Sequence, residues 1–371
     1  YHETAEFVEP YVLRVGDVHI TSRMIFLCTG SRPALPPVEG LTGTGYLTSD
    51  TVLTMERLPR SIVIIGGGYI AAEFGHFFAS MGSEVTVIGR NRRFIPDEEP
   101  EISDVAKLLM SEHMKILTNY EALEVLRDGN GLKKVIARER ESKQEIVLSA
   151  EEILVATGRV SNTDILHPEK GGIRTDKNGW IEVNEFMETS QPGIYAFGDA
   201  DGKFLFKHVA NYESRIVYYN AALNWKVRAD YHAIPHAIFS YPEVAGVGMK
   251  EAEAIGKLGE NKVLIGFQRY EDTARGLSMG ARGCFVKVLV ERGTGRILGA
   301  HIIGPHASIL LHEIIPLMYT QEQDARVILQ GMHIHPALSE VVERAFAAVM
   351  EPAHYHHVLG HFFEELGLPI S

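Results

Sequence analysis

The chain has 371 residues, of which 45% are hydrophobic and 23% charged, as in an ordinary globular protein of two or three domains. A net charge of −12 argues against nucleic acid or an anionic membrane as a general partner. No apolar run approaches the length of a membrane span, and no signal peptide is visible. The two cysteines form no motif, which is typical of a reducing cytoplasm.

The first part of the chain predicts short strands joined by turns. We expect a hairpin over residues 11–21 around Gly16-Asp17. A buried strand over residues 24–31 would follow, with Cys28 packed in the core as a small apolar residue, as we also expect for Cys284. Residues 31–40 are Pro-rich and predict a surface connection, and residues 48–58 predict a short helix.

Residues 61–73 carry a nucleotide-binding pattern. Four apolar residues predict a buried strand, and Gly66, Gly68 and Ala71 then have the G-x-G-x-x-G/A spacing before a helix over 71–80. Gly66 would make the tight turn, Gly68 would let the backbone approach a pyrophosphate, and Ala71 would let helix and strand pack closely. A second strand over 84–88 completes the context that the motif requires. The sequence therefore predicts dinucleotide binding rather than a glycine-rich turn in an unrelated unit.

The end of the second strand is where the 2′ position of the cofactor would be recognised. An NAD site usually has Asp or Glu there, whereas this chain has Gly89 followed by Arg90, Arg92 and Arg93. Guanidinium groups bind phosphate well, and no carboxylate would repel it. We therefore expect NADPH rather than NADH, the alternative being a solvated basic loop.

The segment after the Rossmann unit ends in a strand and turn like those that precede the unit. Residues 102–113 predict a helix, and residues 122–127, 132–140 and 145–148 predict an antiparallel meander. A strand over 152–159 ends in Thr157-Gly158, as the earlier strand ends in Thr29-Gly30. Two such exits around one Rossmann unit indicate a domain, residues 46–154, inserted into another.

A short strand over 193–199 ends in Gly198-Asp199 and precedes a helix over 203–222. The Asp199 carboxylate could accept hydrogen bonds from ligand hydroxyls, or it could cap the helix, and the local sequence leaves both open. From about residue 231, strands and helices are segregated, which predicts an α+β domain. The expected strands are 237–240, 262–270, 284–291 and 297–303, and the expected helices are 306–320, 324–331 and 339–350.

These stretches together resemble one family along essentially the whole chain. The chain is similar to the pyridine nucleotide-disulfide oxidoreductases, the group of glutathione reductase, dihydrolipoamide dehydrogenase, mercuric reductase and mycothione reductase. The matching motifs, in order, are Cys28-Thr-Gly-Ser31, Gly66-Gly-Gly-Tyr-Ile-Ala-Ala-Glu73, Ala156-Thr-Gly-Arg159, Tyr195-Ala-Phe-Gly-Asp199, Phe239-Ser-Tyr-Pro-Glu243 and His335-Pro-Ala-Leu-Ser-Glu340. The segment from Lys207 to Glu213 looks most like the mycothione reductase branch.

The resemblance implies an α/β fold in which a Rossmann-type NAD(P) domain is inserted in a partial FAD domain, followed by an α+β dimerisation domain. The expected domains are residues 1–45 with 155–230 for FAD, 46–154 for NAD(P), and 231–371 for the dimer interface. Implied cofactors are FAD and NADPH, and implied partners are a second copy of the chain and a small thiol, disulfide or lipoyl group.

The resemblance also implies residue roles. Asp199 would hold the ribityl chain of FAD, and Lys207-His208 would lie near the pyrimidine end of the flavin. Tyr69 would cover the nicotinamide side of the flavin, with Glu73 by its reactive edge. The complete set of candidate cofactor-binding residues is Gly66, Gly68, Tyr69, Ala71, Arg90, Arg92, Thr29, Gly30, Gly158, Gly198, Asp199, Lys207 and His208.

His335 would be the acid-base residue, oriented by Glu340. Glu340, near the start of a predicted helix, is placed to accept a proton from one imidazole nitrogen and raise the basicity of the other. Taken alone, a His-Pro pair is more often a structural turn, but the resemblance favours catalysis, with His335 rather than His333 fitting the motif. Glu73 completes the candidate catalytic set.

The sequence departs from the family at its start. The N-terminal FAD glycine motif and the Cys-x-x-x-x-Cys redox pair are missing, so we expect a fragment of a cytoplasmic flavoenzyme or a chain that another chain completes. The predicted activity is an NAD(P)H:disulfide oxidoreductase, with a low-molecular-weight disulfide reductase ahead of a dihydrolipoamide dehydrogenase. A non-catalytic nucleotide-binding or dimerisation module is the rival from another class. Four histidines (354, 356, 357 and 361) suggest an exposed or interfacial helix face rather than a metal site.

Overall fold

The computed structural model describes residues 1–369 and contains two compact units. Unit 1 comprises Tyr1–Ala34 and Gly158–Tyr231, and unit 2 comprises Leu35–Thr157 and the described chain from His232 onward. The chain therefore leaves unit 1, builds part of unit 2, returns, and leaves again. This division into two units does not test the boundaries of the three predicted domains, which stay predictions.

Unit 1 is built from short strands and one long helix. An antiparallel sheet contains β1 (Ala5–Glu9), β2 (Val12–Val15) and β3 (Val18–Thr21). Strand β4 (Ile25–Leu27) pairs in parallel with β14 (Ile194–Ala196), and β5 (Ser31–Pro33) pairs antiparallel with β13 (Arg159–Ser161). A 3-10 turn, Gly198–Ala200, follows β14, and helix α4 (Lys207–Ala221) follows the turn. Thus both Thr-Gly exits and the Gly-Asp exit lie in unit 1 or at its edge.

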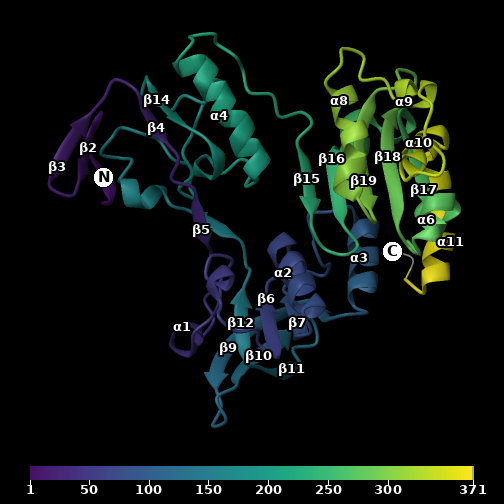
Figure 1. Cartoon of the computed structure of the whole chain (residues 1–371), viewed down its shortest axis with the longest axis horizontal. Helices are drawn as coiled ribbons and strands as arrows, with labels where there is room; N and C mark the ends of the chain where they lie inside the picture. Colours follow the sequence, from purple (N-terminus) through teal and green to yellow (C-terminus); the bar gives the residue numbers. More distant parts are fainter. Residues whose placement is uncertain (370–371) are drawn as a thin grey trace. The chain divides into compact units, whose positions relative to one another are not determined.

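The first half of unit 2 has a Rossmann-type sheet. Its four parallel strands have the order β12 (Glu152–Val155), β6 (Ser61–Ile65), β7 (Glu84–Gly89) and β8 (Lys115–Thr118). Helices α2 (Tyr69–Ser80) and α3 (Pro100–Met110) connect the strands, and α1 (Leu41–Thr44) precedes them. An antiparallel meander of β9 (Tyr120–Arg127), β10 (Lys133–Glu139) and β11 (Glu145–Ala150) lies beside this sheet (Figure 1). The predicted strand–helix–strand unit and meander are confirmed.

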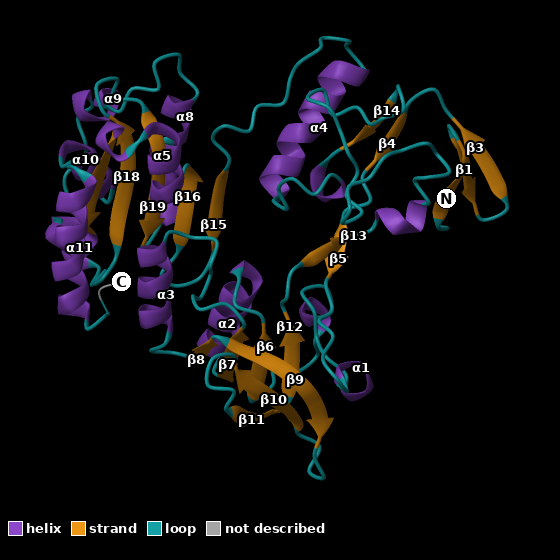
Figure 2. Cartoon of the chain, turned by 180° about the vertical axis from the view of Figure 1, so that it is seen from behind, coloured by secondary structure: helices purple, strands orange, loops and turns teal. Residues whose placement is uncertain are grey.

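The second half of unit 2 is a five-stranded antiparallel sheet with helices. The strand order is β15 (Pro235–Ile238), β16 (Val244–Gly248), β19 (Ile297–Ile303), β18 (Phe285–Glu291) and β17 (Val263–Arg269). The helices are α5 (Glu251–Leu258), α6 (Ala274–Ser278), α7 (Ala307–Leu310), α8 (Ile315–Met318), α9 (Arg326–Gln330), α10 (Ser339–Ala347) and α11 (Pro352–Leu366), coloured apart from the strands in Figure 2.

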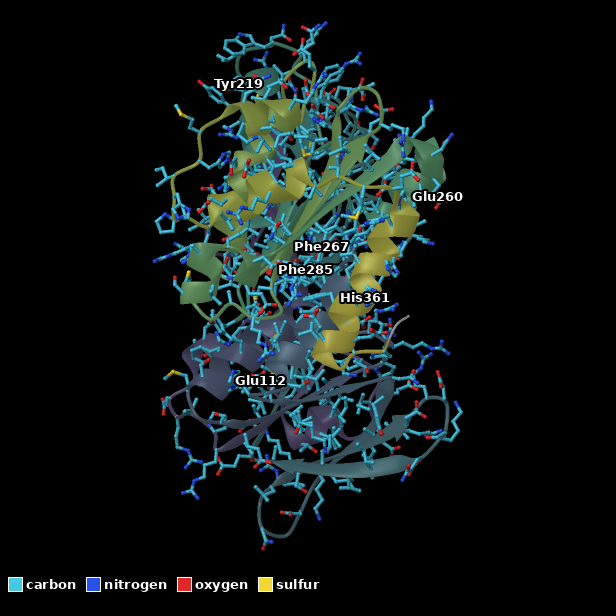
Figure 3. The ribbon with its side chains drawn as sticks, turned by 90° about the vertical axis from the view of Figure 1, so that its right-hand side faces the viewer. Glu112, Tyr219, Glu260, Phe267, Phe285 and His361 are labelled. Atoms are coloured by element: carbon cyan, nitrogen blue, oxygen red, sulfur yellow. The ribbon has the colours of Figure 1, made fainter. Side chains whose placement is uncertain are left out.

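One hydrophobic core is shared by the two halves of unit 2. A single buried cluster extends from Ile62 and Ile64 of the parallel sheet, through α3, to Ile265 and Phe267 of the antiparallel sheet. Figure 3 labels Phe267 and Phe285, whose ring centroids are 5.1 Å apart, close to helix α11. Burial of these large apolar side chains supplies most of the stabilisation of such a contact. The half with the parallel sheet therefore has a fixed position relative to the five-stranded sheet.

Three sequence predictions fail for identifiable reasons. Residues 48–58 form only a 3-10 turn, Val52–Thr54, because the Thr48 and Thr51 hydroxyls bond nearby backbone N–H groups and favour a turn. The helix over 306–320 is broken into α7, a 3-10 turn and α8, which has Pro316 in its first turn. Residues 31–40 contain the short strand β5 rather than only a connection, because Ser31–Pro33 pair with the distant strand β13.

The prediction that Cys28 packs in the core is wrong, whereas Cys284 is buried as expected. Strand β4 alternates: Ile25 and Leu27 are buried, while Phe26 and Cys28 face outward and are exposed. The predicted strand is therefore covered on one face only.

Two further findings concern membrane-spanning helices and metal-binding groups. None of the described helices is long and apolar enough to cross a membrane. Within residues 1–369, no group of three or more His, Cys, Asp or Glu side chains could hold a metal ion. The C-terminal histidines instead contact one another and nearby acids. On α11, His361 (labelled in Figure 3) has Nε2 3.3 Å from His357 Nε2, and His356 Nε2 is 2.8 Å from Glu251 Oε1.

Candidate functional site

The glycine turn after β6 is as tight as the motif predicts. Gly66 has φ +137°, and a Cβ there would lie 2.1 Å from the carbonyl oxygen of Ala156 on the neighbouring strand segment. A side chain is therefore excluded twice, by backbone conformation and by space. The next glycine is equally close to its neighbour, because a Cβ on Gly67 would lie 3.1 Å from the Cα of Gly89.

Gly68 differs, because the space beside it is open. It precedes helix α2 with φ −98°, and a Cβ there would meet nothing within 4 Å. No side chain caps the helix, so the N–H groups of its first turn are available to an anion. Ala71, by contrast, is fully buried against the sheet. Each of the three motif positions has the environment that a pyrophosphate site requires.

Tyr69 and Glu73 are one helical turn apart on α2, and both contact the segment around strand β15. Glu73 Oε1 accepts a hydrogen bond from the backbone N–H of Phe239 (2.9 Å). Burial raises the pKa of Glu73, and this hydrogen bond opposes the shift only in part. The Tyr69 ring stacks on His236, with centroids 5.9 Å apart and an interplanar angle of 11°.

The arginines after β7 differ in their partners. Arg92 is 2.8 Å from Glu141, and Arg93 is 3.2 Å from Asp104, so both take part in ion pairs. Arg90 is exposed, directly after Gly89, and its carbonyl oxygen accepts a hydrogen bond from Arg140 (3.0 Å). Of the two arginines predicted to bind the cofactor, the geometry favours Arg90, because Arg92 would first have to break its ion pair with Glu141.

The candidate flavin residues of unit 1 gather around Asp199. Asp199 Oδ2 accepts a hydrogen bond from the Ser31 hydroxyl (2.6 Å) and lies 3.8 Å from Arg159 Nε, which itself donates to Ser31 Oγ (2.6 Å). Helix α4 begins eight residues later with Phe206 as its N-cap residue, so Asp199 does not cap it. The helix-capping alternative for Asp199 is therefore wrong.

The backbone around Asp199 has room for a ligand. A Cβ added to Gly30 (φ +67°) or Gly158 (φ +107°) would have no heavy atom within 4 Å. The hydroxyl of Thr29 is buried without a hydrogen-bond partner. An unsatisfied buried hydroxyl is costly unless a bound group completes it. Together with the Asp199 carboxylate, these features fit a nucleotide cofactor with hydroxyls and a phosphate backbone.

Glu213 holds the turn that contains Asp199 through a hydrogen bond to its backbone. The fully buried Glu213 side chain accepts hydrogen bonds from Gly198 N–H (2.6 Å) and from the Tyr231 hydroxyl (2.7 Å). Burial, reinforced by nearby Asp201, raises the pKa of Glu213 to about 7. Gly198 itself has φ +65°, so the turn needs both glycine and this carboxyl group.

Lys207 and His208 are exposed in the first turn of α4. Lys207 Nζ donates to Asn211 on the same helix, and the His208 ring stacks on Phe206 with centroids 5.3 Å apart. They share an element with Glu213, which contacts the Asp199 turn.

His335 and Glu340 form the expected pair. His335 Nδ1 lies 3.0 Å from Glu340 Oε1, while 66% of the His335 side chain is exposed. Glu340 also accepts from the backbone N–H of Ala337 (3.1 Å), and these hydrogen bonds, that from His335 foremost, lower the pKa of Glu340. The ring is thus oriented through Nδ1, and Nε2 is left for chemistry. His333, two residues earlier, is bound to Glu313 (2.6 Å).

Comparison with known proteins identifies the family. Residues 2–214 match the model of the pyridine nucleotide-disulphide oxidoreductases, and residues 234–346 match the dimerisation domain of the same family. The chain belongs to the pyridine nucleotide-disulphide oxidoreductase family. The resemblance and the mixed α/β fold predicted from the sequence are thereby confirmed.

Relatives within the family cover most of the chain. Mycothione reductase of Mycobacterium tuberculosis is 36% identical over 341 residues, covering 90% of this chain and 72% of the relative. Dihydrolipoyl dehydrogenase of Synechocystis sp. is 33% identical over 337 residues, covering 88% of this chain and 70% of the relative. Among solved structures, the Cu(II) complex of the HOCl-induced flavoprotein disulfide reductase RclA from Escherichia coli aligns with a TM-score of 0.84 and 27% identity, covering 93% of this chain and 78% of that one.

The structure of this family member adds residues that sequence reasoning missed. Ser31 and Arg159 belong to the motifs quoted above, but no role was given to them, although they hold Asp199. Glu213 ends another quoted segment and holds Gly198. His236 stacks on Tyr69 and is bound to Glu98; both residues lie outside every motif, and no local signal could have found them.

The two outer glycine positions predict different phenotypes. Gly66→Ala should destabilise unit 2 by about 2–4 kcal/mol, because the new Cβ would overlap the carbonyl of Ala156 at a positive φ. Gly68→Ala should leave stability within about 0.5 kcal/mol but weaken nucleotide binding at least about tenfold, because the methyl group fills the phosphate approach. Thermal unfolding and calorimetric titration with nucleotide measure both. Equal stability losses for the two variants would contradict this account of the turn.

The raised pKa of Glu213 predicts a pH effect of defined sign. The folded-state pKa is about 7, above the ordinary value of 4.5, so the unfolded chain ionises first as pH rises. Folding stability contributed by this group is complete below pH 4.5 and is lost as pH rises toward 7. Glu213→Gln should therefore raise stability at pH 8 by about 2 kcal/mol relative to the parent, with the difference vanishing near pH 4.5. Denaturant unfolding of both proteins at the two pH values tests this, and a difference independent of pH would contradict it.

Proposed function

We propose that the chain belongs to an FAD-dependent NAD(P)H:disulfide oxidoreductase that reduces a low-molecular-weight disulfide, as its likeness to mycothione reductase suggests. The observation that carries the proposal is the His335–Glu340 pair, in which one imidazole nitrogen is held and the other is exposed. Such an arrangement serves proton transfer to and from thiols. Overall, NAD(P)H, a proton and a disulfide would give NAD(P)+ and two thiols.

The residues of unit 2 would bind the nucleotide. The N–H groups at the start of α2 would bind its pyrophosphate, and Gly66 and Gly68 keep the turn compact and the approach open. Tyr69 and Glu73, one turn along, would border the nicotinamide. Burial raises the pKa of Glu73, so its protonated form is favoured more than that of an exposed carboxyl group, which would suit a position beside the nicotinamide.

The residues of unit 1 would bind FAD. Asp199 would accept hydrogen bonds from ribityl hydroxyls, while Ser31 and Arg159 keep its carboxylate oriented. The free hydroxyl of Thr29 and the open backbone at Gly30 and Gly158 would complete the cradle, and Lys207 and His208 would approach the ring. FAD, when bound, supplies the two-electron carrier between nicotinamide and disulfide.

His335 would act on sulfur. With Nδ1 bound to Glu340, the imidazole can take a proton from a thiol at Nε2 and return it to a leaving thiolate. Glu340 stabilises the protonated ring, because its pKa is lowered and it stays ionised.

A homodimer is the proposed assembly, and the cytoplasm the proposed location. The family dimerisation domain spans residues 234–346, so it includes His335. The loop around His335 exposes unusually apolar side chains, with Met332 and Ile334 more than three-quarters accessible. Large exposed apolar groups beside a catalytic histidine fit an interface through which His335 would reach the partner's site.

A dihydrolipoamide dehydrogenase is the second candidate, favoured by the 33% identity to that enzyme of Synechocystis. The end of β7 argues for the reductase, because Gly89 and exposed Arg90 suit a 2′-phosphate and no carboxylate is present to bind a 2′-hydroxyl. We therefore propose NADPH as the electron donor.

Arg90 and Arg92 offer a matched test of the coenzyme. Arg90→Ala should raise the KM for NADPH about tenfold or more and leave that for NADH nearly unchanged, because only the former has a phosphate to lose contact with. Arg92→Ala is the control, since Arg92 is occupied by Glu141 (2.8 Å). Steady-state kinetics of the full-length enzyme with both coenzymes measures this. An equal effect on NADH and NADPH would contradict phosphate recognition.

His335 and His333 offer a matched test of the acid-base role. His335→Gln should lower kcat for disulfide reduction by about 10²- to 10⁴-fold while leaving flavin reduction by NADPH unchanged, because the proton is needed only at sulfur. His333→Gln should have little effect, since His333 is bound to Glu313. Stopped-flow measurement of the two half-reactions separates the steps. If His335→Gln slows flavin reduction as much as turnover, the assignment fails.

A further inference from the structure

The last helix, α11, carries a pair of histidines on its exposed face. The match to the family dimerisation domain spans residues 234–346, so α11 lies beyond it. The helix is held on unit 2 by its other face, where Tyr355 is fully buried and its hydroxyl donates to Glu101 Oε1 (2.6 Å). The outward face carries His357 and His361, and both are exposed, so dissolved ions can reach them (Figure 3).

The two imidazole rings converge through one nitrogen atom each. His357 and His361 are four positions apart in α11, so they lie one turn apart on the same face of the helix. Their Nε2 atoms are 3.3 Å apart and the ring planes meet at 80°, so the short contact joins nitrogen atoms and not stacked ring faces. The sequence alone favours an exposed helix face for these residues, and the structure adds the convergence of the two nitrogen atoms.

The separation of the two nitrogen atoms matches that of a metal chelate. Zinc binds imidazole nitrogen at about 2.0–2.1 Å, so two such ligands at a tetrahedral angle lie about 3.3–3.4 Å apart. Imidazole suits zinc and its neighbours in the first transition row, whereas Mg²⁺ and Ca²⁺ prefer oxygen ligands. An ion between the two rings would therefore need little rearrangement, and water would complete its coordination.

A carboxylate supports one of the two rings from behind. Glu364 Oε2 lies 3.5 Å from His361 Nδ1. A carboxylate there favours a proton on Nδ1, which leaves the lone pair of Nε2 available and raises the basicity of the ring. His356 on the same helix differs, because its Nε2 is 2.8 Å from Glu251 Oε1 and is therefore already engaged.

We propose that His357 and His361 bind one divalent transition-metal ion, with zinc as the best fit to their geometry, and that Glu364 positions His361 for it. The two ligands converge only while this turn is helical, so a bound ion would also stabilise α11. None of the three residues is among those proposed for FAD, nucleotide or thiol chemistry. The site therefore goes beyond the proposed function and is tested independently of it.

Titration of the 371-residue chain with ZnCl2 tests the pair. Every protein carries Cys28→Ser, because the exposed thiol of Cys28 would bind zinc by itself. Excess MgCl2 is present because the chain is acidic overall. Calorimetry should show one zinc ion per chain. Affinity should fall at least about tenfold in His357→Gln and in His361→Gln, since each variant removes one of the two ligands.

Two further variants separate the chelate from any other histidine of the helix. His356→Gln is the matched control, and its zinc affinity should stay within about twofold of the parent because Glu251 already binds this ring. Glu364→Gln should weaken zinc binding about threefold, because it removes the charge behind His361 and keeps the shape. Thermal unfolding without metal verifies that each variant is folded. Zinc should raise the unfolding temperature of the parent but not that of His357→Gln.

The outcomes distinguish a chelate from a simple contact between two rings. Loss of zinc affinity in both His357→Gln and His361→Gln, with His356→Gln unchanged, supports the chelate. Absence of a zinc site in the parent, or an equal loss in His356→Gln, overturns it, and the short Nε2 contact is then a hydrogen bond between the rings. An effect of only one of the two ligand variants also overturns it, because a single imidazole is not a chelate. In every case the proposed disulfide reduction stands or falls on its own tests.

Discussion

A single buried lysine holds the two halves of unit 2 in register. Lys287, on the central part of strand β18, is completely buried, and its ammonium group bonds Glu101 and lies 2.7 Å from Glu251 and 3.3 Å from Glu99. Burial would lower the pKa of Lys287, but the surrounding carboxylates raise it, so the ammonium stays charged. The desolvation cost of burying this charge is offset because the three carboxylates are buried beside it. Those partners belong to the loop and first turn of α3 and to α5, so the lysine joins the Rossmann half to the five-stranded sheet.

The geometry of the proposed nucleotide site follows from this connection between the two halves of unit 2. Once α3 is anchored at Glu99 and Glu101, the loop before it is fixed, and this loop binds the glycine turn through Ile95 and Gly67. The same joint brings strand β15 beside α2, where Phe239 binds Glu73 and His236 stacks on Tyr69. The residues proposed for hydride transfer thus depend on an ion cluster that contacts neither of them. An apolar interface alone would allow sliding, whereas directional hydrogen bonds to a buried charge specify one arrangement.

The sequence predicted what local pattern encodes. The strand, glycine turn and helix of the Rossmann unit follow from β-branched runs, Gly66 and the helical period after it, and the His335–Glu340 pair follows from a five-residue spacing. At the candidate sites and in the ion cluster, what the sequence did not predict is non-local. Lys287 interrupts an apolar strand and resembles a solvated position in the sequence, because its partner Glu101 lies 186 positions earlier in the chain. Glu98 and His236 are 138 positions apart, so no window of sequence contains both. Cys28 was misjudged because an apolar run does not reveal whether one or both faces of a strand are covered.

The pKa values of four buried carboxyl groups shift in opposite directions, according to the groups that they contact. Glu98 and Glu101 face His236 and Lys287, and the pKa of each is lowered despite burial. Glu73 and Glu213 accept hydrogen bonds from neutral donors, a backbone N–H in one case and a backbone N–H with a tyrosine hydroxyl in the other. Burial raises the pKa of each, and the charge of Asp201 adds to the shift of Glu213. The first group joins structural elements, while the second lies beside the residues proposed to bind nicotinamide and flavin. Ionising a carboxyl group whose pKa is raised by folding opposes folding, so its presence beside a proposed site fits the chemistry of that site. On this reasoning, Glu73 and Glu213 are the carboxyl groups whose raised pKa values fit the proposed sites, and within unit 2 the ion cluster of Lys287 holds the elements that carry Glu73.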